Sequence, residues 1–406
     1  MRKAALVYSP RFKEYDLGPS HPMKPVRVER TYELIRACGL LEPDGVSVVK
    51  PSPADDSTLA LIHSQEYLDA VRAPSEGRPV RRPYQFGLGT SDNPITEGIY
   101  EATALVVGAS VLAADLVADG EAAVAFNPAG GLHHAHRSRA AGFCVFNDPA
   151  IAIVHLLQRC GEGVKVAYLD IDAHHGDGVQ EAFYQRRDVL TISLHESGRF
   201  LFPFTGEVGE TGEGEGEGFS VNLPLSPYTN DETYLWAFRE AIIPILEAFA
   251  PDYICTQLGA DTHYQDPLTH MCLTTHGYLA VIDEIAARFP RWIAVGGGGY
   301  HLAVVPRAWT LAFACMTGAD PPSRIPASQA GRYRLEPAPA RAAAKARKAA
   351  SSREKEAQTE EEQAPPLHDT SVPTIDEDWA RAAREFAEES VAEIKGRLFP
   401  LHGLRA

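Results

Sequence analysis

The stretch from Asp170 to Gly178 holds three carboxylates and two imidazoles within eight residues. Asp172 and His174 are two residues apart, so along an extended segment their side chains point to the same side. A carboxylate oxygen and an imidazole nitrogen that converge in this way suit a divalent metal such as zinc. A helix-capping turn would explain one carboxylate but not three, so the pattern favours a metal site.

Asp261 supplies a third candidate ligand. It follows an apolar run and the pair Gly259-Ala260. Together with Asp172 and His174 it would leave one metal position open for water or substrate, as catalytic metals require. Taken alone, Asp261 could equally well cap a helix; its place at the end of a strand-like run favours the metal.

His133 and His134 follow Gly130-Gly131-Leu132. Outside the ligand set they could act as general base and general acid. Asp170 and Asp177 would then orient the two rings through their other nitrogens. A lone pair of histidines is more often structural or itself metal-binding, but the flanking glycines and the lack of an apolar-face role favour catalysis.

Tyr300 follows four consecutive glycines. In that position its hydroxyl could stabilise a developing oxyanion. A glycine run beside an aromatic anchor could also be only a tight turn, so this signal is weak on its own.

A sheet must position these residues, because most of them follow short apolar runs that are typical of buried strands. The expected strands are residues 4–8, 46–49, 122–126, the run before Asp170, 189–194, 253–258 and 292–295. The expected helices are residues 26–38, 58–71, 96–118, 148–160, 233–249 and 276–289. This alternation predicts a mostly parallel sheet with helices on both faces. Its sites lie beyond the carboxyl ends of the strands.

Composition narrows the class of protein. The chain has 406 residues, of which 45% are hydrophobic and 23% charged, and this is ordinary for a globular protein. A net charge of -16 argues against a nucleic-acid partner. Six cysteines without paired spacing fit reduced thiols. The N-terminus turns polar too early for a signal peptide, and no apolar run was expected to span a membrane. We therefore expect a cytoplasmic protein.

The composition changes from about residue 321. Residues 336–366 are rich in Ala, Pro, Glu, Lys and Arg, so we expect a disordered linker over residues 321–373. Thr374 and Glu377 form a capping-box pattern that opens an amphipathic helix over residues 374–406. Its expected apolar stripe is Ile375, Trp379, Ala382, Phe386, Ile394 and Leu398. The helix could dock onto its own domain or join two copies, and we expect a role in assembly or stability rather than chemistry.

With these residues in place, the sequence closely resembles the metal-dependent histone deacetylase family, in particular its bacterial acetoin-utilisation members. The matching segments are Gly18–Pro25, Gly130–Ala135, Gly142–Cys144, Asp170–Gly178, Leu258–Asp261 and Gly296–Tyr300. The resemblance predicts a catalytic domain over residues 1–320. It implies the arginase/deacetylase α/β fold, a single mostly parallel sheet of about eight strands with helices on both faces.

The resemblance also implies roles for the chemical residues. Asp172, His174 and Asp261 would bind catalytic zinc, which is iron in some relatives. His133 would pair with Asp170 and His134 with Asp177, while Tyr300 would polarise the acetyl carbonyl. Further implied roles are the walls of the lysine tube (Phe143, Phe202), the acceptor for the amide N–H (the Gly142 carbonyl), the rim aspartate (Asp92), the acetate channel (Arg27) and a structural K⁺ or Na⁺ site (Asp170, Asp172, His174, Ser193, Leu194).

Two positions depart from the pattern or need a choice. Thr90-Ser91 precedes Asp92, where eukaryotic relatives carry an aromatic residue. Three phenylalanines fall within residues 200–204, and Phe202 is selected because it directly precedes Pro203.

The function implied is a zinc-dependent deacetylase that hydrolyses the acetyl amide of N-ε-acetyl-lysine in proteins and releases acetate. His134 is the favoured acid/base, because Asp170 also matches the cation site, which would weaken its effect on His133. The alternatives are an acetylpolyamine amidohydrolase and a non-catalytic acetyl-lysine binding module. An arginase-type ureohydrolase would need ligands for a second metal, which the sequence does not offer.

Overall fold

The computed structural model describes residues 2–333 and 364–405. Its centre is one eight-stranded sheet in the order β2-β1-β3-β8-β7-β4-β5-β6, and every neighbouring pair is parallel. The strands are β1 Ala4–Val7, β2 Val46–Val49, β3 Val124–Asn127, β4 Val166–Asp170, β5 Val189–Glu196, β6 Ser220–Leu225, β7 Tyr253–Gln257 and β8 Trp292–Val295. The predicted parallel sheet of about eight strands is confirmed.

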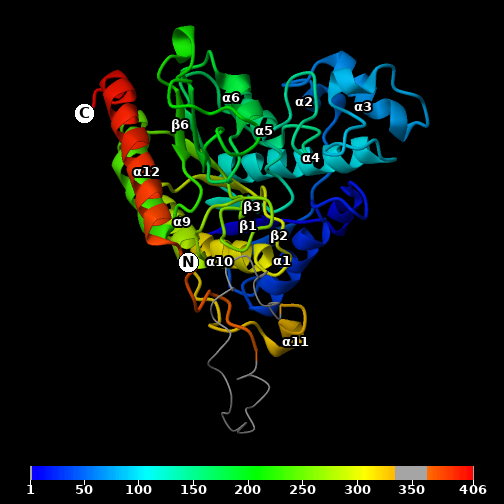
Figure 1. Cartoon of the computed structure of the whole chain (residues 1–406). Coiled ribbons are helices and arrows are strands. Elements are labelled where there is room, and N and C mark those ends of the chain that lie inside the picture. Colours follow the sequence, from blue (N-terminus) through cyan, green and yellow to red (C-terminus); the bar gives the residue numbers. More distant parts are fainter. Residues whose placement is uncertain (1, 334–363, 406) are drawn as a thin grey trace.

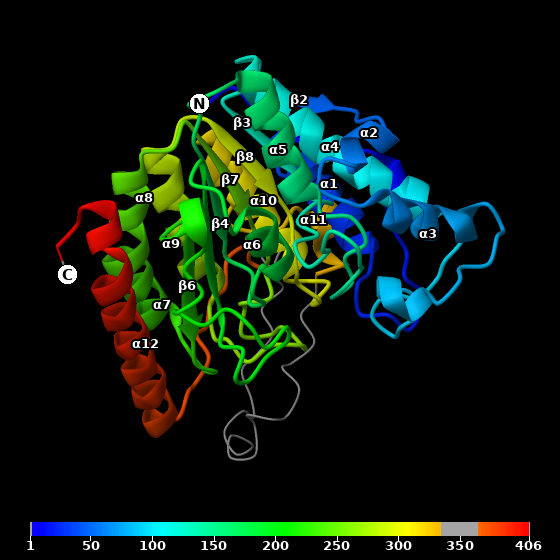
Figure 2. The same ribbon diagram turned by 90° about the horizontal axis from the view of Figure 1, so that it is seen from above.

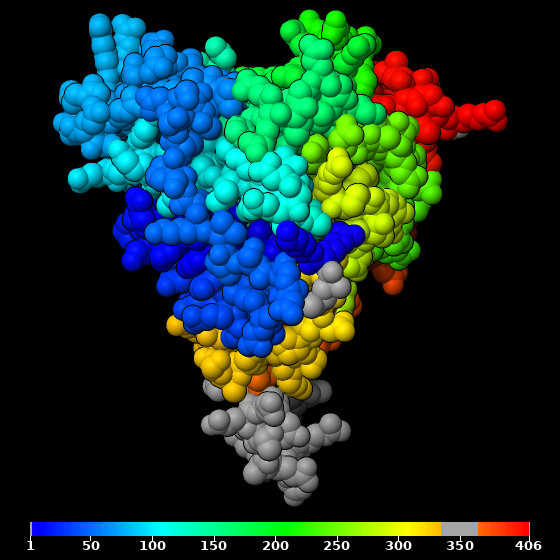
Figure 3. Space-filling view, turned by 180° about the vertical axis from the view of Figure 1, so that it is seen from behind, coloured from blue at the N-terminus to red at the C-terminus, as the bar shows by residue number. Residues whose placement is uncertain are grey.

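Helices cover both faces of this sheet. The helices are α1 Val26–Ala37, α2 Asp56–Leu59, α3 Gln65–Ser75, α4 Ile99–Ala118, α5 Asp148–Cys160, α6 Asp177–Phe183, α7 Asp231–Ala237, α8 Ile243–Phe249, α9 Thr275–Arg288, α10 Val305–Thr317, α11 Ala327–Ala330 and α12 Glu377–Leu398. Helices α4, α5 and α6 lie over one face, and α1, α9 and α10 lie over the other (Figure 1). Helix α12 runs along the β6 edge (Figure 2). Seen from behind, α3 in light blue and the red C-terminal end lie at opposite sides of the molecule (Figure 3).

The strand order places β3, β8, β7 and β4 next to one another in the middle of the sheet. All four are buried along their whole length. Apolar runs without alternation are expected for strands that are covered on both faces. The carboxyl ends of these four strands therefore meet at one edge, where the predicted chemical residues follow them.

Helix α4 is the one helix among the described residues that is long and apolar enough to cross a membrane. The sequence predicted a helix at this place but no membrane-spanning run. In the structure α4 packs against α5, β1 and β3, and 61% of its most apolar stretch of 18 residues is buried inside the molecule. Its apolar character is that of a core helix.

Two expected helices differ from the structure. Residues 58–71 form two helices, because the chain turns after α2 and Ser64 then caps α3 by accepting a hydrogen bond from Tyr67 N. Residues 233–249 are helical throughout, but a π-helical segment, Phe238–Ile242, separates α7 from α8.

Strand β6 was not expected from the residues, since it contains Pro224. Proline cannot donate to a ladder and is tolerated at a sheet edge. Strand β6 is the edge strand, and Pro224 pairs with His195 of β5.

The expected linker over residues 321–373 is wrong for its described parts. Ile325, Tyr333 and Leu367 are each at most 1% exposed and pack with Leu34 and Leu311. The remainder of that linker, residues 334–363, lies outside the described residues.

Helix α12 docks onto its own domain. It packs along β6 and α7, and the Ser390 hydroxyl donates a 2.9 Å hydrogen bond to the Pro224 carbonyl. Its N-cap is Asp376 rather than Thr374. The buried residues of the helix are Ala383, Ala387, Ser390, Val391, Ile394 and Leu398. The expected stripe was thus right at its C-terminal end only, and Trp379 is 51% exposed.

Candidate active site

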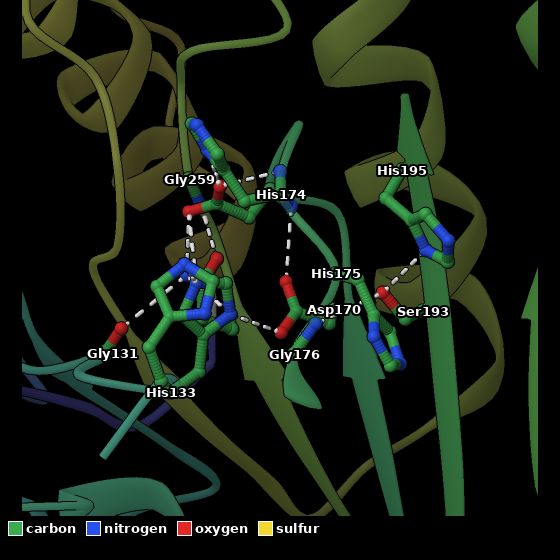
Figure 4. A network of polar contacts seen from close by, with 12 residues as sticks. Gly131, His133, Asp170, His174, His175, Gly176, Ser193, His195 and Gly259 are labelled. Carbon is green, nitrogen blue, oxygen red and sulfur yellow. Dashed lines mark hydrogen bonds and ion pairs between the residues drawn. The ribbon is translucent and has the colours of Figure 1, made fainter. Parts of the chain in front are cut away.

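The predicted chemical residues converge at the carboxyl edge of the four central strands. Figure 4 shows His133, Asp170 and His174 among them. His133 and His134 follow β3, whereas Asp172 and His174 follow β4. Asp261 follows β7 and Tyr300 follows β8. The parallel sheet therefore gathers residues from four distant parts of the chain at one place.

Asp172, His174 and Asp261 form a compact buried group. Their ligand atoms lie within 4.8 Å of one another. His174 Nδ1 lies 3.0 Å from Asp172 Oδ1 and 3.0 Å from Asp261 Oδ2. The other carboxylate oxygens are held from outside, because Asp261 Oδ1 accepts from Ala173 N and Asp172 Oδ2 accepts from Gly298 N.

This group fits a divalent cation. Burial and the adjacent charge of Asp172 raise the pKa of Asp261 to about 6. A cation between two buried carboxylates would relieve that repulsion, and two carboxylates with one imidazole are zinc-type donors. The backbone comes close enough only because residue 298 is glycine: a Cβ there would stand 2.1 Å from Asp261 Oδ2.

The histidine pair is held by two carboxylates. His133 Nδ1 lies 2.7 Å from Asp170 Oδ2, and His134 Nδ1 lies 2.7 Å from Asp177 Oδ1. The two Nε2 atoms lie 3.0 Å apart, so one of them donates to the other. Both rings are buried.

The pKa values of the two imidazoles differ widely. Burial would lower the pKa of His133, but the charges of Asp170 and Asp172 outweigh it and raise that pKa to about 9. Burial and the charge of His133 lower the pKa of His134 to about 4. The directions of these two shifts make His133 Nε2 the donor and His134 Nε2 the acceptor of the hydrogen bond between the rings.

The backbone of Tyr300 is fixed from two sides. Its N–H donates a 2.8 Å hydrogen bond to Asp266 Oδ2. Arg27 Nη1 donates a 2.9 Å hydrogen bond to the carbonyl of Gly299, whose φ of +126° favours glycine. Burial and the charge of Asp261 raise the pKa of Tyr300 well above its usual value, so its hydroxyl stays protonated as a donor.

Aromatic rings pack against two of these residues. Phe143 packs edge-on to Tyr300 with ring centroids 5.7 Å apart, and Phe202 packs edge-on to His134 at 5.1 Å. Gly142 lies beside the second pair: a Cβ there would stand 2.4 Å from His134 Cδ2 and 2.9 Å from Phe202 Cε1. Phe143, Phe202 and Gly142 thus lie beside Tyr300 and His134, and their roles as tube walls and amide acceptor stay predictions.

The remaining predicted residues lie around this centre. Asp92 is exposed, and its carbonyl accepts a 3.2 Å hydrogen bond from His21 Nε2. Arg27 is buried behind Tyr300, with its guanidinium 5.2 Å from the ring of Trp309. Ser193 and Leu194 lie on β5, where Ser193 is paired in register with Asp170.

Sequence reasoning missed several polar residues that hold these groups. Gln257 Nε2 donates a 2.7 Å hydrogen bond to Asp172 Oδ2, and Tyr168 donates one of 2.6 Å to Asp170 Oδ2. His136 bridges Asp177 and Glu181 at 3.4 and 2.6 Å. Gln257 ends β7 immediately before the Leu258–Asp261 motif, which was a usable signal; Tyr168 and Glu181 gave none.

The sequence matches the Histone deacetylase domain over residues 21–316. The acetoin utilization protein AcuC of Bacillus subtilis (strain 168) is 43% identical over 333 residues, which cover 80% of this chain and 85% of the relative. The AcuC protein of Staphylococcus xylosus is 37% identical over 324 residues, covering 78% and 83%.

Solved structures agree with these relatives. The crystal structure of an HDAC homolog from Aquifex aeolicus superposes with a TM-score of 0.81 at 29% identity, covering 96% of this chain and all of that one. An HDAC homolog complexed with SAHA gives the same TM-score, identity and coverage. The arginase/deacetylase fold expected from the resemblance is confirmed. This chain therefore belongs to the histone deacetylase family, as a bacterial acetoin-utilisation member, and is a hydrolytic deacetylase.

Proposed function

We propose that this deacetylase hydrolyses the acetyl amide of N-ε-acetyl-lysine in proteins and releases acetate. One observation carries the proposal. A buried Asp172–His174–Asp261 group faces a His133–His134 pair and Tyr300 at the same edge of the sheet, with aromatic rings packed against His134 and Tyr300.

Asp172, His174 and Asp261 are the residues that would hold Zn²⁺, and Fe²⁺ would fit the same donors. The bound dication supplies polarisation of the acetyl carbonyl and a more acidic water. Asp170, Ser193 and Leu194 are proposed, with Asp172 and His174, to hold a structural K⁺ or Na⁺ beside it.

His134 is the proposed proton carrier. Its Nδ1–H is committed to Asp177, so Nε2 is the nitrogen that takes the proton of the attacking water once its hydrogen bond with His133 Nε2 opens. The water oxygen bonds to the carbonyl carbon while the Tyr300 hydroxyl donates to the developing oxyanion. The C–N bond then breaks, and His134 returns the proton to the leaving amine, so that acetate and lysine form. His133 remains held by Asp170 beside the reacting group.

The residues around the site would select a substrate of a particular shape. Phe143 and Phe202 are proposed to enclose the four methylenes of the lysine stem, and the Gly142 carbonyl would accept the amide N–H. Asp92 would hold the peptide backbone at the rim. Arg27, buried behind Tyr300, would attract the acetate on its way out.

A substrate panel tests the proposal. The zinc-loaded protein is assayed on an acetyl-lysine peptide, on acetylspermidine and on free acetyl-lysine. We expect the highest kcat/KM on the peptide, because Asp92 at the rim would accept hydrogen bonds from the backbone N–H groups of a peptide. A higher kcat/KM on acetylspermidine would instead make the enzyme a polyamine deacetylase. Peptide binding without acetate release would make it an acetyl-lysine binding module.

A further inference from the structure

Asp369 stands outside the matched domain, which ends at residue 316, and yet it is buried inside the catalytic unit. Its Oδ2 accepts hydrogen bonds of 2.8 Å from His263 Nε2 and of 2.8 Å from Thr275 N. Its Oδ1 accepts one of 2.9 Å from Arg307 Nη2. Its own N–H donates to Thr275 Oγ1 at 2.8 Å, and its carbonyl accepts from His276 Nε2 at 2.9 Å.

These contacts lead towards Tyr300 through His263. The ring of His263 donates to Asp369, so its Nδ1 is the acceptor for Gln265 N at 3.2 Å. The carbonyl of His263 accepts from Asp266 N at 2.8 Å, and the Asp266 carboxylate in turn holds Tyr300 N. Asp369 thus fixes the ring, and with it the bend of the loop, that aims Asp266 at Tyr300.

A second path runs through α10. Arg307 lies on α10, only seven positions after Tyr300, and its side chain is 1% exposed. Its Nε donates to the carbonyl of Leu367 at 2.9 Å, and Asp369 is its ion-pair partner. A buried guanidinium needs such a partner to remain in place.

We propose that Asp369 is a positioning residue for Tyr300, so that a residue beyond the matched domain supports the deacetylase site. The inference rests on the proposed role of Tyr300 as oxyanion donor. Asp369 precedes the C-terminal helix, to which the expected role in assembly or stability applies. Asp369 contacts neither the Asp172–His174–Asp261 group nor the histidine pair. Its effect therefore passes through the loop that ends at Asp266.

The variant Asp369→Asn tests this in the full-length, zinc-loaded enzyme. Asn keeps the shape but replaces one acceptor oxygen by an amide donor, which faces N–H groups of His263, Thr275 or Arg307. We expect kcat on an acetyl-lysine peptide to fall between about tenfold and about 100-fold, the scale of a small misplacement of a catalytic group. KM and zinc bound per chain should stay unchanged.

Leu367→Ala is the matched control. Leu367 is fully buried in the same segment, and only its carbonyl contacts Arg307, which alanine retains. Both variants should lower Tm, but Leu367→Ala should keep the wild-type kcat when assayed well below its Tm. If Asp369→Asn lowers Tm and leaves kcat unchanged, Asp369 is a structural anchor and the inference is wrong. Loss of bound zinc in Asp369→Asn would also overturn it.

A double-mutant cycle separates a path through Tyr300 from a general loosening. In the Tyr300→Phe background, Asp369→Asn should lower kcat by about threefold or less, because the group it positions is already absent. A full multiplicative loss would show that Asp369 acts elsewhere. If Tyr300→Phe alone keeps wild-type turnover, the proposed role of Tyr300 is wrong. The single variant Tyr300→Phe shows this independently of Asp369→Asn.

Thr275→Val covers the case in which Asp369→Asn does not fold. It removes only the hydroxyl that accepts from Asp369 N, and so loosens the same anchor more gently. We expect a fall in kcat of about threefold with zinc binding intact. A lower Tm with wild-type kcat in this variant would contradict the inference.

Discussion

His133, His134 and His174 differ in what surrounds their ring nitrogens. His174 Nδ1 faces two carboxylates whose other oxygens are held by backbone N–H groups. His133 and His134 each direct Nδ1 at a single carboxylate and turn Nε2 towards each other. The first arrangement suits a metal ligand, and the second suits a pair of proton carriers.

Metal content should separate the two groups. His174→Ala removes one of three ligands and should abolish zinc binding. His134→Ala should retain about one zinc per chain while activity nearly disappears, because the ring lies outside the ligand set. Zinc analysis of both purified variants checks this, with the wild type as reference. An equal loss of zinc in His134→Ala would make the histidine pair part of the ligand set.

Tyr300→Phe should keep the fold and the zinc but lower kcat by about 10²–10³, the scale for losing one oxyanion donor. The reason is that burial keeps the hydroxyl protonated and therefore able to donate. Steady-state kinetics on an acetyl-lysine peptide give the answer. Wild-type turnover would remove Tyr300 from the mechanism.

His136 gives a pH dependence of stability. Burial would lower its pKa, but its contacts with Asp177 and Glu181 raise that pKa to about 9. An unfolded histidine titrates near 6.5. The contribution of His136 is therefore complete below about pH 6.5 and is lost as the pH rises through about 9.

The variant His136→Gln should lack this pH-dependent contribution to the free energy of unfolding. Free energies of unfolding in urea, measured at about pH 6 and about pH 9.5, should show a difference between wild type and variant that shrinks as the pH rises. A difference that stays constant or grows would show that His136 is not protonated in the folded state.

At the scale of residues, the sequence could identify groups whose type is itself unusual, such as Asp172-Ala173-His174 and Tyr300 after four glycines. It could not identify Asp266, because a lone Asp in a loop has many ordinary uses, and it gave Gln257 only the signal of its place before the Leu258–Asp261 motif. Their roles depend on which backbone N–H or carboxylate the folded chain brings opposite them.

At the scale of elements, α12 protects the edge of the sheet. Edge strands present unpaired backbone groups that favour association with other chains, and proteins commonly cover them. Strand β6 carries Pro224 and is covered by α12, whose Ser390 satisfies the Pro224 carbonyl. A contact between two copies through this helix stays a prediction, and it would have to use exposed residues such as Trp379.

Ile394→Ala should lower the free energy of unfolding by about 2–5 kcal/mol. Ile394 belongs to α12 and is fully buried, so its truncation leaves a cavity. Ala392→Ser, at an exposed position of the same helix, should change it by less than about 0.5 kcal/mol. Urea denaturation of both variants measures the difference. Equal stability of the two would mean that α12 is not docked in solution.

Elements with long apolar runs could be predicted from the sequence. Elements whose position depends on tertiary contacts could not. The strand ending at Asp170 and helix α4 carry apolar runs that few other structures explain. Strand β6 contains a proline that is acceptable only at an edge, and nothing local shows where the edge is. The break between α2 and α3 depends on Ser64 as a cap and on buried His63, which accepts from Asn147 N.

At the scale of the whole molecule, residues far apart in sequence meet behind the active site. Asp369 is 106 positions from His263, and the pair is joined by a 2.8 Å contact. Composition suggested an unstructured tail, because the apolar and charged residues that anchor it are few. Their effect depends on a buried Arg307 whose partner the sequence alone could not identify.

The most direct test of the central claim is acetate release from an acetyl-lysine peptide as metal-stripped protein is titrated with Zn²⁺. We expect almost no activity without metal, then a linear rise with a break at about one zinc per chain, and no rise for His174→Ala. Full activity of the stripped protein, or no acetate release after complete zinc loading, would contradict the claim.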